Sequence, residues 1–128
     1  MKNKILIIIA ISISLFIILV VALKSKPEKI QEVSSNVTID SGKQIIHIIS
    51  KPGGYSPRVV YAKAGVPTVL EIESQNSYGC ERAFRVPSLK ISQELPTDGK
   101  TTFDFGIPSK DITGTCSMGM YTFKINFI

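Results

Sequence analysis

The chain has 128 residues, a formal net charge of +5, two cysteines and one histidine. This length is typical of a single domain, and two cysteines are too few for a disulfide-rich scaffold, although they are enough for one bridge. The basic residues are scattered and form no stripe that alternates with aromatic residues, so the composition argues against a nucleic-acid-binding protein.

The first predicted element is an apolar helix. Residues 5–23, ILIIIAISISLFIILVVAL, form a 19-residue run without a charge. As an α-helix this run is roughly 28 Å long, which is close to the hydrocarbon thickness of a bilayer. A cleaved signal peptide has a shorter apolar core and a small-x-small cleavage site, and neither is found here. We therefore predict that residues 1–23 form an uncleaved, single-pass transmembrane anchor.

The side of the membrane on which the rest of the chain lies is left open by the charges. Lys2 and Lys4 precede the apolar run, and Lys24, Lys26 and Lys29 follow it. Because both flanks are basic, the tendency of basic residues to lie on the cytoplasmic side does not decide the orientation.

A polar segment and a β domain follow the helix. Residues 24–42 are polar and poor in large apolar residues, which predicts a flexible stem. Residues 43–128 predict an all-β domain, because short β-branched and aromatic runs alternate with Gly/Pro turn signals. The predicted strands are 43–50, 58–62, 67–74, 90–95, 101–107 and 120–128. This spacing favours an antiparallel sandwich or barrel.

Most of the sulfur in the chain lies in the stretch TCSMGM. Cys116, Met118 and Met120 occupy alternate positions separated by small residues, so one thiolate and two thioethers could converge. The second cysteine, Cys80, lies in SQNSYGCERAF between two predicted strands. If the two segments meet at one end of the sandwich, four sulfur atoms form one pocket. Soft sulfur ligands of this kind favour Cu(I).

Two structural alternatives stand beside a metal site. Methionine is mostly core filler, although TCSMGM lies in a Gly/Ser-rich turn and not in an apolar strand. Cys80 and Cys116 could form a disulfide if the domain faces an oxidising compartment. That reading leads to an exported structural or adhesive β-sandwich without metal.

The single histidine limits the redox chemistry. A blue-copper site needs two histidines and a cysteine, whereas this chain has only His47, flanked by isoleucines, which we interpret as a packed or edge-strand residue. A sulfur site without imidazole stabilises Cu(I) against Cu(II), which favours carrying copper over cycling its redox state. An accessory domain of a respiratory oxidase would need histidines from a partner chain.

We predict no enzyme and no catalytic residues. A Ser-His-Asp or Cys-His arrangement would have to use His47, and no nucleophile motif lies near it. Glu71 and Glu73 alternate with apolar residues as on a solvated strand face. No glycine-rich phosphate loop occurs, and the aspartates are too dispersed for a calcium loop.

Three stretches together resemble a known family: YSPRVVYAKAGVPTVLEI, GCERAFRVP and TGTCSMGMYTFKI. They resemble the cupredoxin-like domains of bacterial copper-handling proteins. With the N-terminal helix, the chain is similar to the membrane-anchored cupredoxin-fold Cu(I) chaperones of Gram-positive bacteria. The Cys-x-Met-x-Met loop paired with an upstream Gly-Cys is the most specific element, and the tyrosine-proline and Ala-Gly-x-Pro elements mostly indicate the fold.

The resemblance implies an all-β, cupredoxin-like Greek-key sandwich with the metal loops at one end. It implies Cu(I) ligation by Cys80, Cys116, Met118 and Met120, with one or two ions bound. It further implies delivery of Cu(I) to a copper-exporting P-type ATPase in the same membrane, and a cytoplasm-facing domain with reduced thiols. We expect the β domain to be monomeric.

A two-ion site is chemically reasonable for this set of ligands. Two thiolates can bridge two Cu(I) ions, and the thioethers can cap one of them. Because a neutral thioether is a poorer donor than a thiolate, we expect the ion nearer the methionines to be held more weakly and to leave by ligand exchange.

Overall fold

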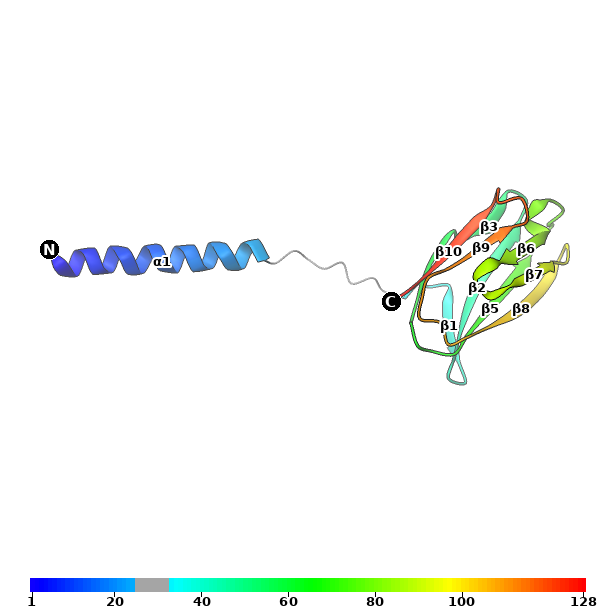
Figure 1. Ribbon diagram of the computed structural model, residues 1–128, viewed down its shortest axis with the longest axis horizontal. Coiled ribbons are helices and arrows are strands. Elements are labelled where there is room, and N and C mark those ends of the chain that lie inside the picture. The colour runs from blue at the N-terminus through cyan, green and yellow to red at the C-terminus, as the bar shows by residue number, and fades with distance from the viewer. Residues whose placement is uncertain (25–32) are drawn as a thin grey trace. The chain divides into compact units, whose positions relative to one another are not determined.

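The computed structural model describes residues 1–24 and 33–128, in two compact units. The N-terminal unit carries helix α1, Lys2–Lys24, which follows the predicted apolar run (Figure 1). Within the described residues, no helix combines the length and the apolar character required to cross a membrane. The predicted helix is therefore confirmed, whereas its assignment as a transmembrane anchor is not supported. Residues 25–32 of the predicted stem lie outside the described residues.

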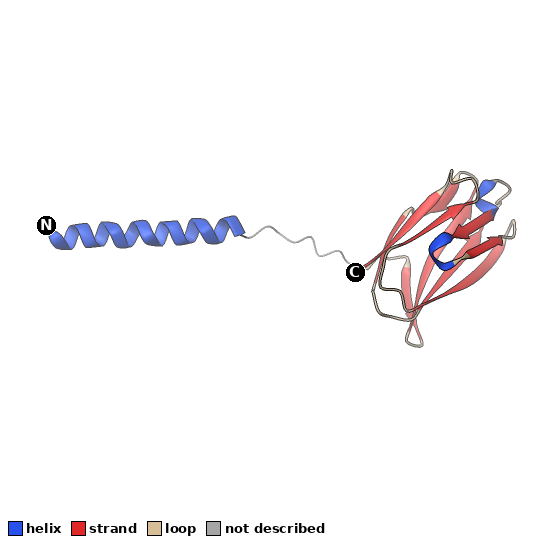
Figure 2. Cartoon of the chain, viewed as in Figure 1, coloured by secondary structure: helices blue, strands red, loops and turns tan. Residues whose placement is uncertain are grey.

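The second unit is a β-sandwich of two mixed sheets, drawn in red in Figure 2. The strands of residues 33–128 are β1 (Val37–Asp40), β2 (Lys43–Lys51), β3 (Gly54–Ser56), β4 (Val59–Ala62), β5 (Thr68–Ser74), β6 (Ala83–Val86), β7 (Ile91–Glu94), β8 (Gly99–Gly106), β9 (Ile112–Cys116) and β10 (Thr122–Phe127). One sheet has the order β1-β2-β5-β8, with β3 also paired to β2, and the other has the order β4-β10-β9-β6-β7. Two short 3-10 turns, η1 (Cys80–Arg82) and η2 (Pro87–Leu89), flank β6.

Alternating side chains build the core between the sheets. In β2 every second residue is buried, including Ile46 and Ile48, and in β10 Phe123 and Ile125 point inward. Three aromatic rings meet in the middle of the core: the Tyr55 and Phe123 centroids are 5.3 Å apart at an edge-on angle, and Phe84 stacks nearly parallel to Phe123. Burial of this apolar surface is the main stabilising contribution to the fold.

The six predicted strands are all present, but the sheets are not purely antiparallel as predicted. Strand β2 pairs with β5 in parallel, and β10 pairs with β4 in parallel. Parallel neighbours need a crossover connection. Here the chain between β2 and β5 supplies it, because β3 stays beside β2 and β4 joins the opposite sheet.

The folded domain also begins earlier than predicted. Residues 24–42 were predicted to be a flexible stem, but Val37–Asp40 forms strand β1 and pairs with β2 over Lys43 to Ile46. Ser34 already contacts β4, since its N–H donates to the Tyr61 carbonyl at 2.9 Å. The strand has four residues and three of them are exposed, so it lacks the alternation that identified the longer strands.

Candidate metal site

Two chain segments meet at the candidate site. Cys116 is the last residue of β9, and Cys80 is the first residue of η1, three residues before β6. The antiparallel pairing of β6 with β9 sets Phe84 opposite Cys116 and so draws the η1 turn toward the end of β9. The Cα atoms of Cys80 and Cys116 are 5.8 Å apart, and the two residues form a disulfide. The predicted meeting of the two cysteine segments is therefore confirmed.

The β9–β10 turn that carries the methionines is fixed through its backbone. The Ser117 N–H donates to the Ala83 carbonyl at 2.8 Å, which links the turn to the start of β6. The Cys116 N–H donates to the Tyr121 carbonyl at 3.0 Å, and Gly119 closes the turn with a φ of 68°. This left-handed conformation favours glycine, which explains the glycine between the two methionines.

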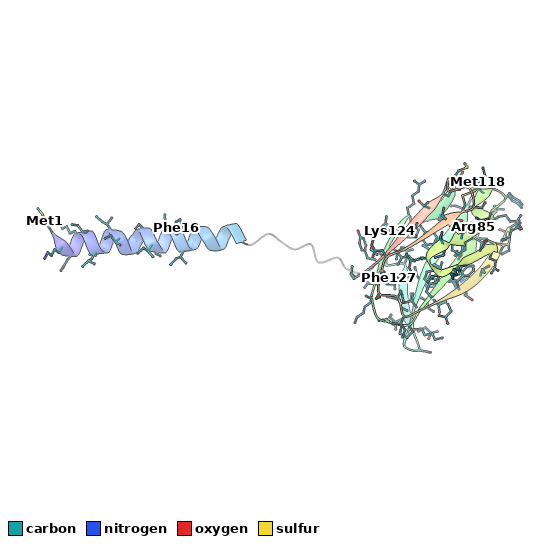
Figure 3. The ribbon with its side chains drawn as sticks, viewed as in Figure 1. Met1, Phe16, Arg85, Met118, Lys124 and Phe127 are labelled. Carbon is teal, nitrogen blue, oxygen red and sulfur yellow. A yellow bond between two sulfur atoms is a disulfide. The ribbon has the colours of Figure 1, made fainter. Side chains whose placement is uncertain are left out.

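The four sulfur-bearing residues differ strongly in exposure. Cys116 is 1% exposed and Cys80 is half-buried, whereas Met118 is 73% and Met120 61% exposed. Figure 3 shows Met118 at one end of the β domain. One buried and one half-buried cysteine thus adjoin a turn whose methionine side chains are exposed to solvent. The structure brings the two cysteines into direct contact and leaves both methionine side chains exposed on the adjoining turn.

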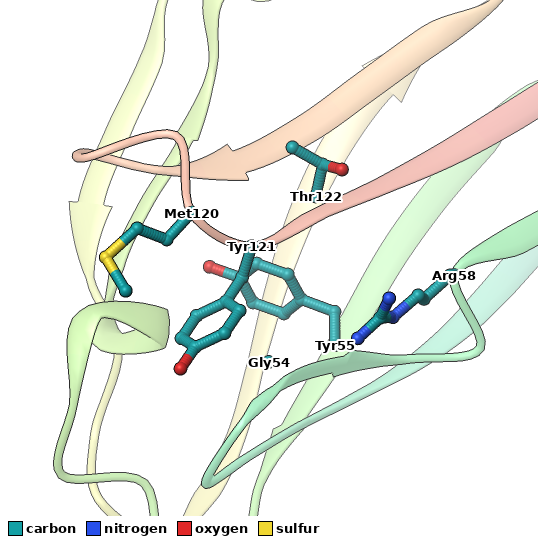
Figure 4. A pocket seen from close by; sticks show the side chains of 6 residues that line it. All are labelled: Gly54, Tyr55, Arg58, Met120, Tyr121 and Thr122. Atoms are coloured by element: carbon teal, nitrogen blue, oxygen red, sulfur yellow. The ribbon is translucent and has the colours of Figure 1, made fainter.

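A small pocket lies beside Met120 (Figure 4). Its volume is about 50 Å³, and it is lined by Gly54, Tyr55, Arg58, Met120, Tyr121 and Thr122. This space holds a water molecule or two and is too small for an organic substrate. The pocket therefore supports no small-molecule site next to the sulfur residues.

A buried glutamate holds the turn that carries Cys80. Glu81 is 2% exposed, and its Oε1 atom accepts hydrogen bonds from the N–H groups of Tyr78 at 3.2 Å and Gly79 at 3.0 Å. The Tyr55 hydroxyl donates to the Glu81 carbonyl at 2.7 Å. Burial, with the nearby Glu81 charge, raises the pKa of Tyr55, so its hydroxyl stays a donor. Glu81 was not among the residues predicted for the site, because its position next to Cys80 does not specify which way its side chain turns.

Hard metal ligands do not gather in the described part of the chain. No cluster of three or more His, Cys, Asp or Glu side chains is placed to hold a metal ion there. His47 lies on β2, between β1 and β5, so it is not on an edge strand. Its ring contacts the Thr38 hydroxyl at 2.8 Å and the Glu71 carboxylate at 3.1 Å.

Comparison with known proteins adds a family and a fold. Residues 12–127 match the model of the family described as cupredoxin-like domain. A search of curated proteins gives no match. Among solved structures, the chain is similar to the metal-binding domain of the Cu(I)-exporting P-type ATPase CopA from Streptococcus pneumoniae D39, solved with Cu(I). The TM-score is 0.64 and the identity 17%, over 72% of this chain and 92% of that one.

A second similar structure is a copper-binding protein solved in its apo form. Its TM-score is also 0.64 and its identity 19%, and the match covers 72% of this chain and 94% of that protein. At these identities the two likenesses establish a shared fold.

Proposed function

Because the chain belongs to the cupredoxin-like domain family, we propose that its reduced form is a Cu(I)-binding carrier that acts without catalysing a reaction. The ligands are Cys80, Cys116, Met118 and Met120. The observation that carries the proposal is the contact of the two cysteines, with Cα atoms 5.8 Å apart, beside a turn that presents two exposed methionines. Both similar structures are copper-binding domains by their descriptions, which supports the choice of metal.

Copper binding requires reduction of the disulfide. A thiol reductant such as glutathione supplies two electrons and two protons and is itself oxidised to its disulfide, which leaves Cys80 and Cys116 as two thiols. Cu(I) then displaces the two thiol protons and binds the thiolates. Thiolate and thioether donors are soft and match Cu(I). The thiolates hold one ion, and a second ion bridged by them is capped by the methionines.

The exposed methionines suit a carrier that hands on its ion. A thioether binds Cu(I) more weakly than a thiolate does, and an incoming thiolate can reach an ion near Met118 and Met120 from solvent. We propose that the receiving partner is a copper-exporting P-type ATPase. One similar fold is the metal-binding domain of such an exporter, which supports this choice of partner class.

A location at the cell membrane, with the β domain facing the cytoplasm, remains a proposal from the sequence. It rests on the uncharged run of residues 5–23, because none of the described helices qualifies as a span. Fractionation of cells that produce the full chain or a chain lacking residues 1–23 tests it. Recovery of both forms in the same soluble fraction would overturn the membrane location.

A second candidate function is an exported β-sandwich that holds no metal. The Cys80–Cys116 disulfide favours it, since the two residues are 36 positions apart and closing a loop of this length stabilises a fold by roughly 3–4 kcal/mol in the chain-entropy account. The two functions predict different redox states in the cell: reduced thiols for a carrier and a persistent bridge for a structural domain.

Thiol counting and a copper titration distinguish the two functions. We expect two reactive thiols in protein isolated anaerobically without added reductant, and saturable Cu(I) binding against a competing chelator. Cys80→Ser and Cys116→Ser should each abolish the tight step. A protein with no reactive thiols as isolated, and no Cu(I) binding after reduction, would support the disulfide-bonded structural domain instead.

A further inference from the structure

The buried carboxylate of Glu81 has no role in the proposed copper ligation. Carboxylates are seldom buried unless they are bonded, and this one is 2% exposed directly after a proposed ligand, Cys80. Its Oε1 atom accepts two N–H groups, from Tyr78 and Gly79, which are the two residues before Cys80. The carboxylate thus folds back over the chain that leads into the cysteine.

The main chain of Glu81 is held from the opposite direction. The Tyr55 hydroxyl, on β3, donates to its carbonyl at 2.7 Å, and Tyr55 is packed edge-on against Phe123 in the core. The side chain of Glu81 therefore fixes the residues before Cys80, and its backbone is fixed to the sandwich. Cys80 lies between these two anchoring points.

Gly79 leaves the space that the carboxylate uses. A Cβ atom at this position would lie 2.7 Å from the Glu81 Oε2 atom, closer than real contacts allow. The Gly79 backbone has φ −101° and ψ −155°, which any residue can adopt, so a side chain at this position would conflict with the Glu81 carboxylate and not with the backbone conformation.

We propose that Glu81 is a positioning residue that holds the Cys80 thiol against Cys116 before copper arrives. Its role in copper affinity rests on the proposed function, whereas its role in pairing the two sulfurs does not. Because this turn is already ordered, less conformational entropy is lost when the two sulfurs come together, through a disulfide or through an ion. The carboxylate acts here as a hydrogen-bond acceptor.

The pairing of the Cys80 and Cys116 thiols can be measured without metal, as the equilibrium constant for forming their disulfide in a glutathione redox buffer. Glu81→Ala is expected to lower the effective concentration of the two thiols by about tenfold, because it removes the acceptor of two hydrogen bonds whose net contributions are each modest. Glu81→Gln keeps an oxygen acceptor in the same place and should stay within about threefold of the natural protein. A loss equal to that of Glu81→Ala in the glutamine variant would overturn the acceptor role.

A control separates positioning from general destabilisation. Ile72→Val removes a buried methylene from β5, in the sheet that carries neither cysteine. This variant should have a lower Tm and an unchanged glutathione equilibrium. If Ile72→Val shifts the glutathione equilibrium as much as Glu81→Ala does, the shift caused by Glu81→Ala reflects lower stability alone, and the proposal is wrong.

Gly79→Ala is expected to displace the Glu81 carboxylate while leaving Glu81 itself unchanged. In the natural background the new methyl group pushes the carboxylate away and should shift the thiol equilibrium in the same direction as Glu81→Ala. In the Glu81→Ala background the space is empty, so Gly79→Ala should have little further effect. Additive shifts in the double variant would show that the two residues act separately and would overturn the proposal.

A Cu(I) titration of the same variants completes the test. We expect Glu81→Ala to weaken the tight, cysteine-dependent step by about tenfold and to leave the methionine-dependent step unchanged. If no variant binds Cu(I) but the glutathione equilibrium shifts as expected, the proposed function fails and the positioning role stands. If the natural protein binds Cu(I) and Glu81→Ala changes neither measurement, the positioning role fails and the proposed function stands.

Discussion

Substitutions of Met118 and Met120 in the β9–β10 turn should change copper binding without changing the stability of the fold. Met118 and Met120 are among the most exposed apolar residues of the β domain, and neither belongs to the buried core cluster. The turn is closed by main-chain hydrogen bonds from Ser117 and Gly119, which a side-chain change leaves in place. A double change, Met118→Leu with Met120→Leu, therefore removes both thioether sulfurs and little else.

The expected magnitudes follow from these contacts. The free energy of unfolding should change by less than about 0.5 kcal/mol, as is usual for exposed sites away from caps and buried bonds. Under the proposed function, copper binding should fall from two ions to one, because the first ion keeps its thiolate ligands and the second ion loses the thioethers that cap it.

The assay is an anaerobic titration of the reduced full chain with Cu(I) against a competing chelator, paired with thermal unfolding of the same samples. Ile107→Leu, at another highly exposed apolar position, serves as the control and should change neither result. If the double variant retains every binding step of the natural protein, the methionines are not ligands and the two-ion account is refuted.

Three further predictions concern the scaffold. Gly114→Ala should lower the free energy of unfolding by about 1–3 kcal/mol, because a Cβ at this position would overlap the buried Phe123 ring; an unchanged thermal midpoint would contradict this packing. Tyr55→Phe should cost about 1–2 kcal/mol in a urea titration, since a buried carbonyl of η1 loses its donor, and a neutral result would show that water replaces the hydroxyl. Hydrogen bonding to Lys100 lowers the pKa of Glu71, so this carboxylate stabilises the fold above its ordinary pKa of 4.5, and that stability is lost as the pH falls through the lowered pKa. Glu71→Gln should therefore reduce the decrease in Tm below about pH 5. An unchanged dependence of Tm on pH would show that the interaction of Glu71 with Lys100 does not stabilise the fold.

The longer strands could be predicted because their periodicity reflects the sandwich. Strands β2, β5 and β10, of six to nine residues, alternate buried residues with partly buried or exposed ones, and each was predicted within about two residues of its ends. Strands β1, β3, β6 and β9 were missed, and with three to five residues each they are too short for alternation to identify them. The four-residue strands β4 and β7 were predicted because turn signals flank them. Helix α1 was predicted from its apolar run, but the predicted membrane span was not supported.

The candidate site was predictable in composition and only partly in geometry. The alternation of Cys116, Met118 and Met120 identified a sulfur-rich turn from the sequence alone. That Cys80 lies against this turn depends on the register of β6 and β9, and neither of these strands was predicted. The contribution of Glu81 depends on which way its side chain folds, and a sequence does not specify this.

X-ray absorption at the copper edge of the reduced, Cu(I)-loaded full chain tests the central claim most directly. Sulfur ligation predicts a first shell made of sulfur atoms, with no nitrogen from His47 and no carboxylate oxygen, and a lower sulfur count in the Met118→Leu, Met120→Leu variant. A shell dominated by nitrogen or oxygen, or copper that washes away with Cys80 and Cys116 both reduced, would contradict the assignment of this turn as a copper site.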